Sequence, residues 1–358
     1  MIDFITLETR LLHGGRLADA EAMALFASPD LLRIGALAAR INQQRNGDAV
    51  YFNVNRHINY TNICVNRCTF CAFSKGVDDD GCYTLALNDI LQKCSEAKAA
   101  GATEVHMVGG LHPDLPFDFY LEMLSAIRAD NPGLHIKAFT AVEIDYFAGM
   151  TGQPVATVIR ELVDAGLGSM PGGGAEIFSR TVRDQICPEK ISGERWLEVI
   201  ETVHQTGLKT NATMLFGHLE TAADRVDHMA RLRGLQDRTN GFQAFIPLAF
   251  QPDNTRVPGA QGVGGVDALK TLAISRLYLD NFRHIKAYWI MLGLKIAQVA
   301  LCFGVNDLDG TVVEEKIGHD AGADSPQHLD KEQLCSLIRK AGKRPVERDT
   351  LYAELRTY

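Results

Sequence analysis

The stretch "NYTNICVNRCTFCAFSK", residues 59–75, carries three cysteines, Cys64, Cys68 and Cys71, in a C-x3-C-x2-C spacing. It follows directly on a β-rich run, so we expect it to form a loop at the end of a strand. The other five cysteines are scattered singly along the chain. Because a large protein of a reducing compartment has little use for disulfides, we interpret the triplet as metal ligands or reactive thiols.

The overall composition is that of a soluble globular protein. The 358 residues are 46% hydrophobic and 22% charged, which suffices for one large domain with a sizeable core. No run of about 18 apolar residues occurs, and the first residues lack the basic and apolar parts of a secretory signal. We therefore expect a cytoplasmic protein without a membrane partner. The net charge of −8 argues against bulk attraction to nucleic acid.

Short β-rich runs recur from residue 50 onward, and amphipathic, helix-like segments separate them. In the segment 87–101, for example, apolar residues share one helical face and Gly101 supplies the stop. Eight such runs alternating with helices over about 250 residues predict a parallel (β/α)8 TIM-type barrel, for which that length is typical. The runs are 51–59, 104–110, 135–141, 168–173, 208–217, 241–250, 284–290 and 299–305.

An open doubly wound sheet is the alternative to the barrel. Seven of the eight runs end in Gly, Pro, Asn, His or Asp clusters, which favours the barrel because its loops build one site at one face. We divide the chain into a helical preamble (1–48), the barrel (49–307) and a C-terminal closing segment with a terminal helix (308–358). In the preamble, Asp19 and Ser28 are placed to cap helix starts.

The cysteine triplet is compatible with two kinds of metal site. A structural zinc site normally closes with four ligands, and no second pair of Cys or His follows at a suitable distance. His57 lies nearby, but the ordinary interpretation of a strand histidine is a packed or hydrogen-bonded side chain. A [4Fe-4S] cluster accepts three protein thiolates and leaves one iron free for another ligand. The cluster is favoured, and zinc remains the alternative.

The triplet resembles the motif of the radical S-adenosylmethionine superfamily, in which an aromatic residue, here Phe70, precedes the last cysteine. The resemblance implies that Cys64, Cys68 and Cys71 hold three irons, and that the amino and carboxylate groups of S-adenosylmethionine chelate the fourth. An electron from the reduced cluster then cleaves this cofactor to methionine and a 5′-deoxyadenosyl radical. A closed barrel interior suits such chemistry because it keeps the radical away from solvent.

Glycine-rich and polar strand ends supply further cofactor candidates. The glycines of "VHMVGG" resemble the superfamily motif whose backbone binds the amino group of S-adenosylmethionine, although a tight turn is the alternative. An acid after the third strand can accept hydrogen bonds from ribose hydroxyls or simply begin a helix. An arginine after the fourth strand can pair with a carboxylate or remain solvated. These candidates are Gly109, Gly110, Thr140, Glu143, Glu176, Ser179 and Arg180.

Longer segments extend the resemblance through almost the whole chain. "GGGAEIF", "TNATMLFGHLET" and "GFQAFIPLAFQPDNT" resemble a small group that acts on futalosine and deazaflavin intermediates. Within it, "HIKAYWIMLG" and "NDLDGTVVEEKIGHDAGA" are most similar to the aminofutalosine synthase family of menaquinone biosynthesis. That resemblance implies addition of the adenosyl radical to 3-[(1-carboxyvinyl)oxy]benzoate, an enolpyruvyl benzoate, with rearrangement and decarboxylation to 6-amino-6-deoxyfutalosine.

Other functions remain open at this point. Dehypoxanthine futalosine cyclase and the deazaflavin-side synthase that uses tyrosine would share the same cysteine triplet. A non-catalytic zinc- or cluster-binding barrel is the remote alternative, because fold alone does not decide function.

A substrate with two carboxylates needs cationic or hydrogen-bonding anchors, which the later strand ends offer. Asn211 and Thr213 lie two residues apart on one strand, so both side chains point to the same face, either inward or beneath a helix. His218 follows at the strand end, where it can donate a hydrogen bond or a proton, or be purely structural. The further candidates are Lys286, Tyr288 and Asp307.

Basic residues also surround the cysteine loop, namely Arg56, Arg67 and Lys75. Reduction of a cluster needs a one-electron donor, and this basic surface could receive an acidic flavodoxin or ferredoxin. A solvated surface is the alternative interpretation of such a short basic run.

Overall fold

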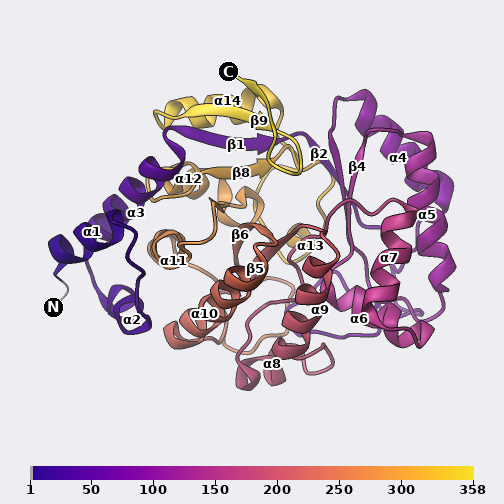
Figure 1. The fold of residues 1–358 in the computed structure, drawn as a ribbon. Helices are drawn as coiled ribbons and strands as arrows, with labels where there is room; N and C mark the ends of the chain where they lie inside the picture. The colour runs from indigo at the N-terminus through magenta and orange to yellow at the C-terminus, as the bar shows by residue number, and fades with distance from the viewer. Residues whose placement is uncertain (1–2) are drawn as a thin grey trace.

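The structure is a computed structural model that describes residues 3–358, with parallel strands inside and helices outside (Figure 1). Within these residues no helix is long and apolar enough to cross a membrane. The strands are β1 (Ala49–Asn53), β2 (Asn55–Ile58), β3 (Glu104–Met107), β4 (His135–Ala138), β5 (Thr210–Phe216), β6 (Phe242–Ala249), β7 (His284–Ile285), β8 (Asp307–Gly310), β9 (Arg344–Arg348) and β10 (Glu354–Thr357). The helices are α1 (Phe4–Leu12), α2 (Asp19–Ala27), α3 (Leu31–Asn46), α4 (Leu87–Ala99), α5 (Phe117–Asp130), α6 (Ala141–Thr151), α7 (Val155–Ala165), α8 (Arg180–Ile186), α9 (Gly193–Gln205), α10 (Ala222–Thr239), α11 (Gly265–Tyr278), α12 (Trp289–Ala300), α13 (Ile317–Asp320) and α14 (Lys331–Lys340).

The strands associate in three sheets whose pairings are parallel except that of β10 with β9. Their orders are β10-β9-β1-β8, β2-β3-β4 and β5-β6-β7. Isolated parallel bridges continue the pairing from β4 to β5 and from β7 to β8. Because a single residue separates β1 from β2, the pairing passes from β2 through the other strands and returns to β1. The predicted α/β class with parallel strands is confirmed. The bridging pairs are Lys137–Ser169, Met170–Thr210 and Lys286–Asp307.

Four of the predicted strands differ from the observed ones. The run 51–59 divides into β1 and β2, and the fourth run contributes only the bridges at Ser169 and Met170. Helix α12 begins inside the run 284–290, which limits β7 to two residues. The strand predicted at 299–305 is wrong, because the end of α12 and the following turns occupy it and β8 is the next strand. A short apolar run fits a buried helix end as well as a strand.

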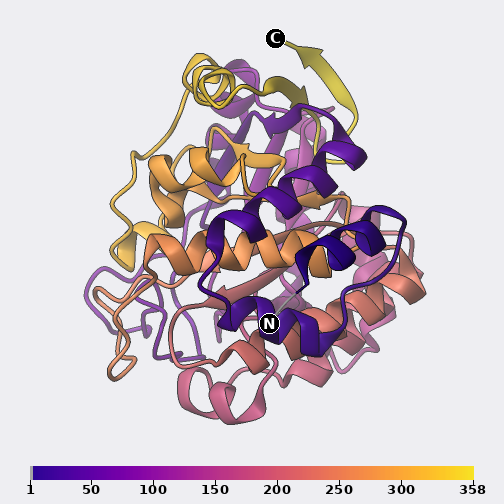
Figure 2. The same ribbon diagram turned by 90° about the vertical axis from the view of Figure 1, so that its left-hand side faces the viewer.

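The expected helices of the preamble are α1, α2 and α3, while residues 1–2 lie outside the described part. Helices α2 and α3 both pack against α11, and Figure 2 shows α3 crossing in front of it. The predicted caps are wrong: Asp19 is the first residue of α2, and Ser28 follows its last turn. Asp3 instead caps α1, where its carboxylate accepts hydrogen bonds from the backbone of Ile5 and Thr6.

The C-terminal segment adds two strands that the sequence did not reveal. Helix α14 is present as expected, but β9 pairs in parallel with β1 and β10 returns antiparallel to β9. The sequence of β9, "RPVER", has too many charges for an ordinary buried strand. Two of these charges are nevertheless buried, because Arg348 pairs with Asp307 and Glu347 pairs with Lys331.

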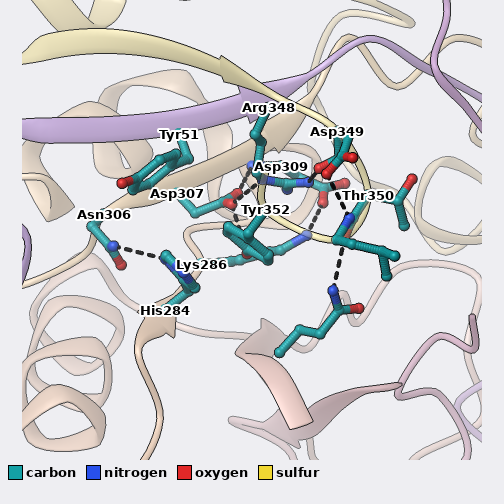
Figure 3. A network of polar contacts seen from close by, with 12 residues as sticks. Tyr51, His284, Lys286, Asn306, Asp307, Asp309, Arg348, Asp349, Thr350 and Tyr352 are labelled. Carbon is teal, nitrogen blue, oxygen red and sulfur yellow. Dashed lines mark hydrogen bonds and ion pairs between the residues drawn. The ribbon is translucent and has the colours of Figure 1, made fainter. Parts of the chain in front are cut away.

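Asp307 joins this segment to the centre of the molecule (Figure 3). Its carboxylate accepts hydrogen bonds from Arg348 Nε at 2.8 Å, from the Tyr352 hydroxyl at 2.8 Å and from the backbone of Asp309 at 2.6 Å. The Tyr352 ring in turn stacks on His284, with centroids 3.7 Å apart. Asp307, one of the candidate site residues from the sequence, therefore anchors the C-terminal segment instead.

We predict that Asp307→Asn strongly destabilises the fold. The substitution leaves the Arg348 guanidinium, which is 0% exposed, without its counter-charge. Breaking one side of a buried ion pair costs about 3–5 kcal/mol of unfolding free energy. Urea denaturation followed by circular dichroism measures this loss. Asp184→Asn is the matched control, because Asp184 is exposed and only loosely paired with Arg180; an equal loss in both variants would contradict the assignment.

Candidate active site

The strands and the loops that follow them enclose a cavity of about 290 Å³. Its wall takes residues from the cysteine loop, from β2 to β6 and from the segments after β7 and β8. The cavity thus collects most of the predicted site residues, although their roles stay predictions. Those on the wall are Cys64, Cys68, Phe70, Cys71, Gly109, Gly110, Thr140, Glu143, Glu176, Asn211, Thr213 and Tyr288.

The cysteine loop is fixed to the rest of the structure by backbone hydrogen bonds. Cys64 N donates to Lys75 O at 2.9 Å and Val65 N donates to Leu111 O at 2.9 Å. Burial raises the pKa of the Cys64 thiol and raises the pKa of Cys68 to about 12. Burial therefore makes these thiols hold their protons more tightly, and iron binding must release the protons.

The donor set fits an iron-sulfur cluster. All three cysteines are free thiols on one cavity wall. In the described residues, no three or more His, Cys, Asp or Glu side chains are arranged to hold a single metal ion. A [4Fe-4S] cluster does not need such convergence, because each thiolate binds a different iron.

The glycines after β3 allow the cysteine loop to approach closely. A Cβ atom on Gly110 would lie 2.1 Å from the carbonyl oxygen of Ile63 and 2.9 Å from Cys64 Cβ. A Cβ atom on Gly109 would lie 2.6 Å from the Tyr60 ring. Only glycine therefore lets the end of β3 pack directly against the chain that enters the triplet.

Glu143 lies between the β3 and β4 ends of the cavity. Its carboxylate accepts hydrogen bonds from the Tyr60 hydroxyl at 2.6 Å, from Thr140 N at 2.6 Å and from Gly109 N at 3.3 Å. Thr140 and Glu143 form a capping box at the start of α6. Burial raises the pKa of Glu143 despite these donors. The helix-start interpretation is confirmed, and the residue also faces the cavity.

A buried ion pair lies beside the triplet and was not predicted. Glu176, in the left-handed region with φ 46°, accepts a hydrogen bond from Lys190 Nζ at 2.7 Å. The same ammonium lies 5.0 Å from the centre of the Phe70 ring. Burial would lower the pKa of Lys190, but the neighbouring Cys68, Glu176 and Cys187 raise it. Lys190 therefore places a permanent positive charge beside Cys68.

The predicted strand-end anchors separate into two groups. Asn211 and Thr213 face the cavity and not a covering helix, which were the two orientations that the sequence left open. Thr213 Oγ1 donates a hydrogen bond to Gly172 O at 2.6 Å. Tyr288 also lies on the wall. Lys286 lies behind it and donates to Asp309, a wall residue, at 2.5 Å.

Besides Lys286, four predicted residues lie off the cavity wall. His218 is structural, since its ring contacts Leu215 O at 3.1 Å and accepts from Leu219 N at 2.7 Å. The Arg180 side chain is 92% exposed and points to solvent, so it is withdrawn as a ligand of cofactor or substrate. The four are Ser179, Arg180, His218 and, as described above, Asp307.

The sequence reasoning also missed an inner group of polar wall residues. Strands β2, β3 and β4 each place a nitrogen-bearing side chain on the wall. One acid comes from β8 itself and another from the segment after it. A polar residue in the middle of an otherwise apolar strand, as in "EVHMV" and "HIKAF", was the available signal. These residues are His57, His106, Lys137, Asp309 and Glu315.

We predict that Gly110→Ala lowers the iron and sulfide content of the protein after anaerobic reconstitution. The added methyl group cannot fit beside Ile63 O, so the cysteine loop must move. Overpacking of this kind displaces the backbone, and we expect bound iron to fall to less than about half of the wild-type value. Gly149→Ala is the control, because a Cβ atom there meets nothing within 4 Å. Full iron content in Gly110→Ala would show that the close approach is not required.

Two sequence families match this chain. The Radical SAM superfamily matches residues 58–232, and the CofH/MqnC C-terminal region matches residues 239–357. The chain is 44% identical over 358 residues to aminodeoxyfutalosine synthase of Thermus thermophilus, which covers 99% of this chain and 96% of the relative. It is also 44% identical over 317 residues to 5-amino-6-(D-ribitylamino)uracil–L-tyrosine 4-hydroxyphenyl transferase of Methanopyrus kandleri, covering 87% of this chain and 86% of that one.

A solved structure agrees in fold. The FeFe-hydrogenase maturase HydG from Carboxydothermus hydrogenoformans superposes with a TM-score of 0.75 at 16% identity, over 98% of this chain and 80% of the other. At this identity the similarity concerns the fold alone. The sequence matches, by contrast, extend over nearly the full length and include the cysteine triplet that holds the [4Fe-4S] cluster of this superfamily. The chain therefore belongs to the radical S-adenosylmethionine superfamily, with a C-terminal region of the CofH/MqnC type, and is a radical S-adenosylmethionine enzyme.

Proposed function

We propose that this chain is an aminodeoxyfutalosine synthase that joins the adenosyl part of S-adenosylmethionine to 3-[(1-carboxyvinyl)oxy]benzoate. Two relatives of that name support this function, because each is 44% identical to the chain over nearly its full length, covering 99% and 98% of it. Menaquinone biosynthesis is the pathway that this activity serves.

The observation that carries the proposal is the composition of one cavity wall. The two segments that resemble the aminofutalosine synthase family in sequence are 284–293 and 306–323. They are separated by most of α12, yet both contribute side chains to the same cavity as the cysteine triplet. Residues that distinguish this family therefore lie where a substrate would contact them. They are Tyr288 and Met291 from the first segment, and Asp309, Glu315, Ile317 and Ala321 from the second.

We further propose that the parallel strands close into a (β/α)8 barrel around this cavity. The support is the parallel pairing that leads from β2 to β8 and returns to β1. The barrel portion then extends to the end of β8 at Gly310, slightly beyond the predicted boundary at 307. A closed wall keeps water and stray hydrogen donors away from a radical reaction.

The cluster and S-adenosylmethionine, when bound, supply a 5′-deoxyadenosyl radical. In the proposed reaction the new C–C bond would join the adenosyl 5′ carbon to the terminal alkene carbon of the enol ether. The side chain would move from the ether oxygen onto the ring carbon, and its carboxylate would leave as carbon dioxide with the return of one electron. S-adenosylmethionine is consumed in this reaction, because its adenosyl group remains in the product.

The residues of this chain bind and orient the reactants. Cys64, Cys68 and Cys71 would hold three irons, and the backbone after β3 would bind the amino group of S-adenosylmethionine. Asn211 and Tyr288 line the cavity, and we propose that they contribute to orienting the substrate. Positioning is the main requirement, since the alkene carbon must lie against the adenosyl 5′ carbon.

A cytoplasmic flavodoxin or ferredoxin is the electron donor that we propose. The basic residues around the cysteine loop carry less unpaired charge than the sequence suggested. Arg56 is paired with Glu96 and Glu314, and Arg67 is paired with Asp79. Lys75 is the member of that set without an ion pair in residues 3–358. Its charge remains available for an acidic donor.

We predict that the reconstituted protein forms aminodeoxyfutalosine. Under anaerobic conditions with a chemical reductant, S-adenosylmethionine and the enolpyruvyl benzoate, mass spectrometry should detect one product molecule for each S-adenosylmethionine consumed. A parallel reaction with L-tyrosine and 5-amino-6-(D-ribitylamino)uracil tests the transferase alternative, and one with dehypoxanthine futalosine tests the cyclase. Formation of only 5′-deoxyadenosine and methionine from the enolpyruvyl benzoate would contradict our proposal.

We also predict that Cys68→Ala abolishes the cleavage of S-adenosylmethionine. A cluster with only two protein thiolates is not held in place, so release of 5′-deoxyadenosine should fall at least about 1,000-fold. Cys302→Ala is the matched control because that thiol is exposed and lies off the cavity wall. Chromatography of the nucleoside products gives the measurement. Retained cleavage in Cys68→Ala would remove the cluster assignment.

A further inference from the structure

Three nitrogen-bearing side chains form a row across the inner wall of the cavity. His57 on β2, His106 on β3 and Lys137 on β4 are direct partners in the parallel register. All three line the cavity, and the two imidazole centres are 4.4 Å apart. We call His57, His106 and Lys137 the nitrogen row.

The nitrogen row lies deeper in the cavity than the cofactor-binding strand ends. His106 precedes Gly109 by three residues, and Lys137 precedes Thr140 by three. At a rise of about 3.3 Å per residue, the row is roughly 10 Å below these ends. The cysteine loop follows the strand ends, so the row is at the opposite end of the cavity from the triplet.

The two imidazoles lack protein partners. In residues 3–358 neither ring forms a hydrogen bond to another residue, and His57 Nε2 is a buried atom without a partner. Burial lowers the pKa of both rings, and their mutual proximity lowers that of His106 further, so both are neutral. Buried polar groups in proteins are rarely left unpaired. An N–H donor from each ring therefore remains to be satisfied by a ligand.

The acids around the row are already matched by cations. Glu104 binds Lys137 at 2.7 Å, and Asp309 binds Lys286 at 2.5 Å. The wall acid Glu315 contacts His319, and this contact raises the pKa of that imidazole to about 9. One oxygen of Glu104, Oε1, has no hydrogen-bond partner in the described residues. The groups that can donate to a ligand at this end are one N–H of each neutral imidazole and the remaining N–H groups of the Lys137 ammonium.

We propose that the nitrogen row is the receptor for the ring carboxylate of the aromatic substrate. This inference rests on the proposed function, whose substrate carries one carboxylate on the ring and one on the reacting side chain. The side chain must reach the adenosyl radical at the cluster end, so the ring points to the inner end. A carboxylate has acceptor sites for several donors and matches the N–H groups that the two imidazoles and the Lys137 ammonium can direct at it.

The first test compares two substrates in two proteins. The wild-type enzyme and His106→Leu are assayed with the enolpyruvyl benzoate and with 2-phenoxyacrylate, which lacks only the ring carboxylate. Loss of one hydrogen bond to a charged group should lower kcat/KM of His106→Leu for the benzoate about 30-fold, mainly through KM. For 2-phenoxyacrylate the two proteins should differ less than about threefold. An equal loss with both substrates would overturn the proposal.

Lys137 requires a different substitution, because removing it alone leaves the buried Glu104 carboxylate without its counter-charge. The double variant Lys137→Met/Glu104→Gln removes the buried pair together and should weaken use of the benzoate but not of 2-phenoxyacrylate. His106→Gln, which keeps an N–H donor, should recover part of the loss seen in His106→Leu. Cluster content and uncoupled formation of 5′-deoxyadenosine should be unchanged in all variants. A fall in these readouts with no change in substrate preference would indicate a structural role instead.

A binding test separates this inference from the proposed function. Calorimetry with the reconstituted protein and S-adenosylmethionine compares 3-hydroxybenzoate with phenol as probes. Wild type should bind 3-hydroxybenzoate at least about tenfold more tightly, and His106→Leu should lose that preference. This pattern without any aminodeoxyfutalosine formation would refute the proposed function and leave the receptor. Equal binding of both probes by wild type, with normal product formation, would refute the receptor alone.

Discussion

A buried carboxylate at Asp307 connects the C-terminal segment to the cavity. It accepts hydrogen bonds from Arg348, from Tyr352 and from the backbone of Asp309, so it is fully matched although it is inaccessible to water. An unmatched charge at this depth would cost several kcal/mol of folding free energy. The contacts of Asp307 with the C-terminal segment and with the backbone of Asp309 are therefore kept together. The backbone N–H of Asp309 donates to Asp307, and its φ of 68° lies in the left-handed region. The Asp309 side chain lines the cavity and accepts a hydrogen bond from Lys286. The last strands of the chain thus support the wall on which substrate chemistry depends.

The opposite end of the cavity is set by close packing instead of charge. Gly110 leaves no room for a Cβ atom beside Ile63 O, and this contact brings the cysteine loop onto the end of β3. Lys190 adds a positive charge beside Cys68, which favours the thiolate form that binds iron. A cluster end and a polar inner end therefore face each other across one enclosed space, which suits a reaction that joins two bound molecules.

Relatives with different names share the same percentage identity with this chain over the parts that align. The synthase of Thermus thermophilus and the transferase of Methanopyrus kandleri are both 44% identical to it, so overall identity does not separate their chemistry. The separation must come from the few side chains that touch substrate. The segments after β7 and β8 supply such side chains, and the donors on β2, β3 and β4 match the aromatic carboxylate in the proposed reaction. Fold and cofactor are shared properties of the superfamily, whereas the reaction is decided by the cavity wall.

The sequence by itself determined the cluster motif, the α/β class and most helices, because these depend on local spacing and periodicity. It also placed Asn211, Thr213 and Tyr288 near the cavity from strand parity and position. It misjudged the strand at 299–305, since a short apolar run does not distinguish a helix end from a strand. Only the tertiary structure decided which polar residues face inward. His218 is held by its own turn, through Leu215 O and Leu219 N, and Asp307 is held by Arg348 and Tyr352 from the C-terminal segment. His57 and His106 lie side by side through the register of β2 and β3, and neither ring has a hydrogen-bond partner in residues 3–358.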